Sequence, residues 1–197
     1  MVSFRYQNTN YFLIPSSTQD RLLAFDAGWP CSLYEYARAM KTTSIALEQI
    51  GWAIVSHFHL DHAGLIGEFQ ERGIHCVVFE NQTGTIDAME ELVARKYERY
   101  TRIKKDKLIS LTTGDARRFL EGIGIRGEVI QTPGHSDDSV SFITEDHEAL
   151  IGDLYPLSQL MDDDKKSHRS WDLIQSKGVK HIYPSHAMAF GLEEEGV

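Results

Sequence analysis

The sequence predicts an α/β domain with a core of two sheet layers flanked by helices. Short apolar segments rich in branched and aromatic residues recur along the 197 residues, and many are bounded by Gly, Pro, Asp or Ser, as buried strands are. Segments with helical spacing lie between them. No repeat, low-complexity tract or Pro/Gly-rich linker interrupts the chain, so we expect residues 1–197 to form a single domain.

The expected strands are short and mostly end beside a turn or polar residue. Their ranges are Tyr11–Ile14, Leu22–Phe25, Trp52–Val55, His75–Phe79, Leu108–Leu111, Glu128–Gln131, Val140–Ile143, Ala149–Ile151 and His181–Tyr183. Polar side chains just beyond strand ends are presented to a common rim by a rigid scaffold. The strand ends are therefore the places to search for a functional site.

Three helices are expected from capping and periodicity. Ser32 and Glu35 have the spacing of a capping box, which predicts a helix starting there. Apolar residues three and four apart predict a longer helix over Thr85–Ile103, with charged residues such as Glu90 mainly off its apolar stripe. A short helix around Ser170–Ser176 is expected after an acidic loop.

The charge balance disfavours some partners. The net charge is −9, from 29 acidic and 20 basic residues, so nucleic acids and anionic membranes are not expected as principal partners. The runs Asp162–Asp164 and Glu193–Glu195 are interpreted as solvated loop and tail. No apolar run approaches the roughly 20 residues of a membrane span. We expect a small-molecule substrate, and the sequence indicates no oligomeric state.

The N-terminus and the cysteines predict a cytoplasmic protein. Residues 1–6 lack the basic and apolar regions of a secretory signal. Cys31 and Cys76 have no CxxC spacing, so we expect two free, packed thiols in a reducing compartment rather than a bridge or metal ligands.

The hexapeptide HFHLDH at residues 57–62 is the most informative segment. Imidazole and carboxylate groups are ligands for zinc, iron and manganese. Alternate side chains of an extended chain point the same way, so His57, His59 and Asp61 can converge while His62 turns aside. One loop could thus supply ligands to two adjacent metal ions.

Three later strand ends each deliver one further candidate ligand. These residues are His135, Asp153 and His186, and each alone would be an ordinary turn residue. Together with the hexapeptide they complete two sites: His57, His59 and His135 in one, Asp61, His62 and His186 in the other, and Asp153 bridging them. Each site keeps an open position for water, as catalytic metal sites do. The other histidines, His75, His147, His168 and His181, are given no metal role.

These motifs resemble those of the metallo-β-lactamase superfamily of metallohydrolases. The matching segments are FDAG at 25–28, HFHLDH followed by AG at 63–64, TPGHS at 132–136, IGD at 151–153 and YPSH at 183–186. The resemblance implies an αβ/βα four-layer sandwich of two mixed β-sheets flanked by helices, with a dinuclear metal site at one edge of the sheets. It also implies that Asp26 supports the ligands, the alternative being a simple turn aspartate.

The sequence differs from several branches of this superfamily, and these differences indicate which branch it resembles most. The second site has no cysteine ligand, and the Asp153 bridge looks like that of glyoxalase II, lactonases and related esterases. His59 stands where flavo-diiron members typically have Glu, and no flavodoxin domain is visible. With 197 residues, we expect neither the inserted domain of RNA-processing members nor the C-terminal glutathione-binding part of glyoxalase II.

The sequence therefore predicts a dinuclear metal-dependent hydrolase that cleaves a small ester, thioester or lactone. A water held between two cations has its pKa lowered from 15.7 towards roughly 7, which makes a metal-bound hydroxide the nucleophile. Asp61 would be both a ligand and a proton acceptor. Two divalent ions are expected, zinc by ligand chemistry, although iron or manganese also accepts such sites.

Alternatives remain open on function and on substrate contacts. The same site would suit a phosphodiesterase, and a mononuclear-iron persulfide dioxygenase-like oxidoreductase is a further alternative; a binding protein with a vestigial site is the least supported. Tyr155 is either a catalytic donor to a developing oxyanion or part of an aromatic–proline turn. The segment Lys165–Arg169 is either a cationic substrate contact or a solvated loop.

Overall fold

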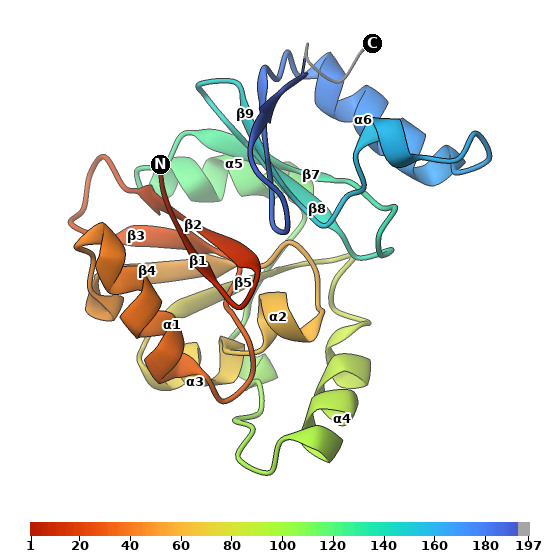
Figure 1. Cartoon of the computed structure of the whole chain (residues 1–197). Coiled ribbons are helices and arrows are strands. Elements are labelled where there is room, and N and C mark those ends of the chain that lie inside the picture. Colours follow the sequence, from red (N-terminus) through yellow and green to blue (C-terminus); the bar gives the residue numbers. More distant parts are fainter. Residues whose placement is uncertain (193–197) are drawn as a thin grey trace.

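The structure is a computed structural model that describes residues 1–192, so the acidic run Glu193–Glu195 lies outside the described residues. Two mixed sheets face each other, with α1 (Leu33–Met40), α3 (Ile66–Glu71) and α4 (Ile86–Lys96) on the outer side of one and α6 (Lys165–Ser176) on the outer side of the other (Figure 1). The arrangement agrees with the sandwich implied by the sequence resemblance.

The first sheet has the strand order β1-β2-β3-β4-β5-β6. Its strands are β1 (Val2–Tyr6), β2 (Thr9–Pro15), β3 (Leu22–Phe25), β4 (Ile50–Ile54), β5 (His75–Phe79) and β6 (Ile109–Leu111). The strands β1 to β3 pair antiparallel, and β3 to β6 pair parallel. Because parallel strands end at the same edge, the segments that follow β3 and β4 start side by side.

The second sheet has the order β11-β10-β9-β8-β7. Its strands are β7 (Gly127–Gln131), β8 (Val140–Thr144), β9 (Glu148–Gly152), β10 (His181–Pro184) and β11 (Phe190–Gly191). Only β9 and β10 pair parallel, with their ends together, and the other pairs are antiparallel. Antiparallel β8 between β7 and β9 brings the end of β7 to the same edge.

The helices are α1 (Leu33–Met40), α2 (Leu60–Ala63), α3 (Ile66–Glu71), α4 (Ile86–Lys96), α5 (Thr113–Gly122) and α6 (Lys165–Ser176). Short 3-10 segments occupy Lys41–Thr43, Leu47–Gln49, Lys105–Lys107 and Leu157–Gln159. No helix among the described residues is long and apolar enough to cross a bilayer.

Three buried clusters lie between the successive layers of the sandwich. Side chains of α1, α3 and α4, such as Tyr36 and Phe69, pack on the outer face of the first sheet. The middle cluster joins the two sheets through residues such as Phe25 and Phe142, and α5 adds to it beside β6 and β7. Trp171 of α6 is fully buried against the second sheet. Apolar burial on both faces holds each sheet rigid at the edge where its strands end.

The strands expected from the sequence are present, and their ends differ by at most two residues. The strands β1 and β11 were not predicted. In β1 only Phe4 is buried, so the sequence lacks the apolar run of an interior strand, and β11 has only two residues. Both are outer strands of their sheets, where half-exposed sequences are tolerated.

The helix expected over Thr85–Ile103 is shorter, because α4 ends at Lys96. The following chain folds back along the helix, and Glu90 holds it there: the Glu90 carboxylate is buried and accepts a hydrogen bond of 2.6 Å from the backbone N–H of Ile103. Glu90 thus caps a turn in the core, a role that periodicity does not reveal.

Two other helix predictions also need correction. The capping box is wrong, since the Ser32 side chain accepts no hydrogen bond from the first turn of the helix and its hydroxyl instead donates to the carbonyl of Trp29, although α1 begins where expected. The segment Lys165–Arg169 is not a loop: it forms the first turns of α6, and Asp164 caps that helix by accepting from the Ser167 N–H at 3.1 Å. That cap explains part of the acidic run Asp162–Asp164.

Candidate metal centre

The hexapeptide emerges from the carboxyl end of β4 and passes directly into α2. His57 is still in the extended segment, His59 is the residue before the helix, and Asp61 and His62 lie within its single turn. Because the chain changes from extended to helical here, the side chains of His57 and His59 point to one group of candidate ligands and those of Asp61 and His62 to another. This local geometry differs from the fully extended loop expected from the sequence.

The remaining candidate ligands come from strand ends of the second sheet. His135 follows β7, Asp153 follows β9, and His186 follows β10. Since these three strands end at one edge, their side chains meet the hexapeptide of the first sheet across the gap between the sheets. The structure brings all seven candidate ligands together.

The first group contains His57, His59, His135 and Asp153, whose potential ligand atoms all lie within 4.8 Å of one another. The His135 Nε2 lies 3.1 Å from the His59 Nδ1 and 3.5 Å from the Asp153 Oδ2. Two nitrogens that share a tetrahedral ion at about 2.1 Å lie roughly 3.4 Å apart. The spacing of this group is therefore suitable for one ion.

The second group contains Asp61, His62 and His186. The Asp61 Oδ2 lies 3.3 Å from the His62 Nε2 and 3.2 Å from the His186 Nε2. This compact group of one carboxylate and two imidazoles is a second set of the ligand types that divalent cations accept.

Asp153 lies between the two groups and presents a different oxygen to each. Its Oδ1 is 3.3 Å from both His62 Nε2 and His186 Nε2, whereas its Oδ2 faces His57 Nε2 at 3.8 Å and His135. A carboxylate in this position can bridge two cations.

Several polar atoms of the cluster are buried without a hydrogen-bond partner among the described residues. They are the His57 Nε2, the His62 Nε2 and the Asp153 Oδ1. Such orphaned atoms cost stability unless something satisfies them. All three face the space between candidate ligands, so the residues present fit divalent cations.

A sequence profile of the metallo-β-lactamase superfamily matches residues 5–186. The chain belongs to the metallo-β-lactamase superfamily. The match includes every candidate ligand and the strands β2 to β10.

Solved structures share the metallo-β-lactamase fold at low sequence identity. A metallo-β-lactamase family protein of Thermus thermophilus has a TM-score of 0.71 and 20% identity, covering 96% of this chain and 73% of its own. TTHA1623, solved in a di-iron-bound form, has a TM-score of 0.70 and 18% identity over 98% of this chain and 95% of its own. An archaeal superfamily protein from Sulfolobus tokodaii has a TM-score of 0.66 and 16% identity over 98% of this chain and 82% of its own.

In this metallo-β-lactamase fold, Asp26 lies directly behind the second group. Its Oδ2 is 2.8 Å from the His62 Nδ1, and its Oδ1 accepts from the Ser56 N–H at 2.7 Å. The hydroxyls of Ser56 and Ser185 also donate to Oδ2. These bonds orient the His62 ring with its Nε2 towards the centre.

Other supporting contacts come from the turn between β1 and β2. The His186 Nδ1 donates to the carbonyl of Asn8 at 3.0 Å, and the Thr9 hydroxyl donates to the Asp61 Oδ2 at 3.3 Å. Sequence reasoning missed Asn8 and Thr9 because nothing in a short polar turn indicates contact with residues so distant. Ser56 was missed too, and its position next to His57 was the available signal.

The electrostatics of the centre keep the carboxylates ionised. Burial opposes ionisation of Asp61 and Asp153, but the close approach of the His186 and His62 imidazoles outweighs it and holds both pKa values well below the ordinary range. The same contacts with the two carboxylates raise the pKa of His186 to about 10. Burial, with His62 nearby, lowers the pKa of His57 well below normal, which leaves its imidazole neutral and able to bind a cation.

Tyr155 lies at the rim of the centre. Its ring meets the His135 ring edge to face with centroids 5.7 Å apart, and half of the residue is exposed. Its backbone carbonyl accepts from the buried Trp171 indole, which anchors the turn. Tyr155 can therefore be part of an aromatic–proline turn through its backbone and still expose its side chain at the rim of the centre.

The cysteines and the remaining histidines take no part in either group of candidate ligands among residues 1–192. Both thiols are free, and Cys76 is buried as expected, but Cys31 is exposed, so the prediction of a packed thiol is wrong there. Cys31 lies in the turn before α1 and has a backbone φ of 59°.

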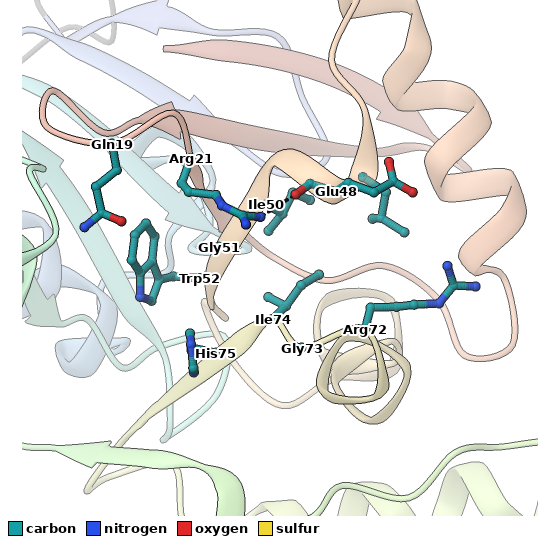
Figure 2. A pocket seen from close by; sticks show the side chains of 11 residues that line it. Gln19, Arg21, Glu48, Ile50, Gly51, Trp52, Arg72, Gly73, Ile74 and His75 are labelled. Carbon is teal, nitrogen blue, oxygen red and sulfur yellow. Dashed lines mark hydrogen bonds between the residues drawn. The ribbon is translucent and has the colours of Figure 1, made fainter.

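A separate cavity of about 420 Å³ lies at the opposite edge of the first sheet, where β3, β4 and β5 begin (Figure 2). Arg21, Trp52 and His75 contribute to its lining. The Arg21 guanidinium is turned to the Glu48 carbonyl, to which it donates at 2.5 Å. No group of candidate metal ligands occurs there in the described part of the chain, so the carboxyl edge is the candidate active site.

Proposed function

We propose that this protein is a dinuclear metal-dependent hydrolase that cleaves a small ester, thioester or lactone. The observation that carries the proposal is the position of Asp153, whose two oxygens face two separate ligand groups. The di-iron form of TTHA1623, a protein with the same fold, supports occupancy by two ions. We expect zinc, with iron or manganese as alternatives.

Two divalent cations bound here would supply Lewis-acid activation of water and polarisation of the substrate carbonyl. The chain's own residues hold and orient the reactants. The Asp61 carboxylate would accept a proton from the attacking water. The Thr9 hydroxyl donates a hydrogen bond to the Asp61 Oδ2 and would fix its position. The Tyr155 hydroxyl, at the open rim, would donate to the substrate oxygen that becomes negative.

The alternative functions depend on the same centre. A mononuclear-iron oxidoreductase needs only one of the two groups, and the complete second group of Asp61, His62 and His186 argues against it. A phosphodiesterase would use both groups. Counting the bound metals therefore cannot distinguish it from the proposed hydrolase, and assays on different substrates are needed.

The test combines metal analysis with activity on the full chain. Protein purified with its native metals, and protein reloaded with zinc, iron or manganese, would be assayed on ester, thioester, lactone, phosphodiester and persulfide substrates. We expect two ions per chain and hydrolysis of a carbonyl substrate. Asp61→Asn should lower kcat by about 10³-fold, and Asp153→Asn should lower the metal count to one or none.

His75→Ala is the matched control, because this exposed histidine lies outside both ligand groups. It should retain both metals and full activity. One tightly bound iron, oxygen consumption with a persulfide and no hydrolysis would overturn the proposal.

A further inference from the structure

A cavity of about 610 Å³ adjoins the candidate metal centre on the side of α4. Two candidate ligands, His59 and Asp61, are part of its wall, one from each ligand group. A molecule positioned at the centre can therefore extend into the cavity without crossing another part of the protein. The volume is in the range of small-molecule binding sites.

The wall of this cavity is largely apolar. One side is formed by Ala88, Met89 and Leu92, which lie on one face of α4 at spacings of three and four. Phe58 and Leu60 of the hexapeptide and Trp29 from the loop after β3 form other parts. Leu92 is 60% exposed although it is a large apolar residue, and covering it with a ligand would remove that surface from water.

The charges around the cavity are unsuitable for an anionic ligand. No Lys or Arg lines it within residues 1–192, whereas Asp137 and Asp138 do. The Asp138 carboxylate is buried and accepts from the Phe58 N–H at 2.7 Å and from the Thr85 hydroxyl at 3.1 Å, so it joins the hexapeptide to α4. Asp137 is exposed and paired with Lys166, which itself lies outside the lining. A carboxylate or phosphate on the ligand would find no cationic side chain among the described lining residues and would meet negative charge.

We infer that this cavity binds the apolar arm of an uncharged substrate. The inference rests on the proposed function and specifies it: the substrate is a neutral ester, thioester or lactone with a medium-length hydrocarbon chain, and not an anionic conjugate.

The first test is a chain-length series with the metal-loaded protein. Esters from acetyl to decanoyl with one leaving group, and acetates with alkyl groups of increasing length, would be compared. We expect kcat/KM to rise about fourfold per methylene in one of the two series until the cavity is filled. A butyryl ester should be hydrolysed at least tenfold faster than the matching succinyl ester, which carries a carboxylate.

Two variants test the assigned wall without threatening the core, since Ala88 and Leu92 are both exposed. Leu92→Lys should reduce the ratio of octanoyl to acetyl hydrolysis about tenfold and improve the relative rate of the succinyl ester. Ala88→Trp should shorten the optimum chain by filling space. Leu173→Lys, an exposed leucine on α6 away from the cavity, is the matched control and should leave both ratios unchanged.

A binding measurement separates failure of this inference from failure of the proposed function. Octanamide should bind more tightly in calorimetric titration than the monoamide of suberic acid, which has the same chain length but carries a carboxylate at the end of the arm, and Leu92→Lys should reverse the preference. If no carbonyl substrate is hydrolysed but octanamide binds in this way, the proposed function fails and the cavity assignment stands. If acetyl esters are hydrolysed with no chain-length preference in either series and octanamide does not bind, the cavity assignment is wrong.

Discussion

The Asp26 carboxylate lies 2.8 Å from the His62 Nδ1, although the two residues are 36 positions apart and lie on different elements. Asp26 adopts a left-handed backbone with φ of 72° directly after β3. Non-glycine residues adopt this conformation at a cost, and Asp and Asn tolerate it best. Asp26 therefore combines a strained backbone with a close contact to a candidate ligand.

Asp26→Asn should therefore weaken metal binding rather than folding. Asn keeps the size and backbone tolerance of Asp but loses the negative charge that orients the His62 ring. We expect metal affinity to fall about 10- to 100-fold, measured by competition with a chelator. Asp146→Asn, in the exposed turn at the end of β9 opposite to Asp153, is the control. An unchanged affinity in Asp26→Asn would show that Asp26 is only a turn residue.

Tyr155→Phe should lower kcat by about 10²-fold while leaving the metal count unchanged. The hydroxyl is the only group removed, and the ring can still pack edge to face on His135. Steady-state kinetics and metal analysis would be measured together. Tyr34→Phe, an exposed tyrosine on α1, is the matched control. Equal kcat values for Tyr155→Phe and wild type would assign Tyr155 to the turn alone.

Gly67→Ala should destabilise the fold even though Gly67 lies inside α3. Alanine is favoured over glycine in a helix by about 1 kcal/mol. Here, however, an added Cβ would collide with the backbone carbonyl oxygens of Thr101 and Arg102. Because backbone cannot move aside easily, we expect a net loss of about 1–3 kcal/mol in urea unfolding. Gly84→Ala has no neighbour within 4 Å and should be nearly neutral; similar losses in both variants would contradict this account.

The two thiols should differ in reactivity. Burial raises the pKa of the Cys76 thiol to about 12, so at pH 8 only about one molecule in ten thousand carries the reactive thiolate, and the group is also covered. Cys31 is exposed, although partial burial and Glu68 raise its pKa somewhat. A thiol reagent at pH 8 should therefore modify one cysteine in the native protein and two in urea. Cys31→Ser should abolish the native reaction, whereas a persisting reaction would place a reactive thiol at Cys76.

The strands of this protein were largely predictable because their runs of apolar residues are local. The interior strands β3 and β5 have the predicted ends, whereas the outer strand β1, with only Phe4 buried, was not recognised. Helix lengths were less predictable. The end of α4 depends on the buried Glu90 carboxylate and its bond to Ile103, a tertiary contact that periodicity does not contain.

The sequence by itself determined the ligand types and their positions after strands, because HFHLDH, His135, Asp153 and His186 carry their chemistry in their side chains. Only the tertiary structure decided how they are grouped. The parallel pairing of β9 with β10 and the turn of α2 place one oxygen of Asp153 towards each group. The apolar cavity beside them combines α4 with two distant loops, and surfaces that arise from such packing have no local sequence pattern.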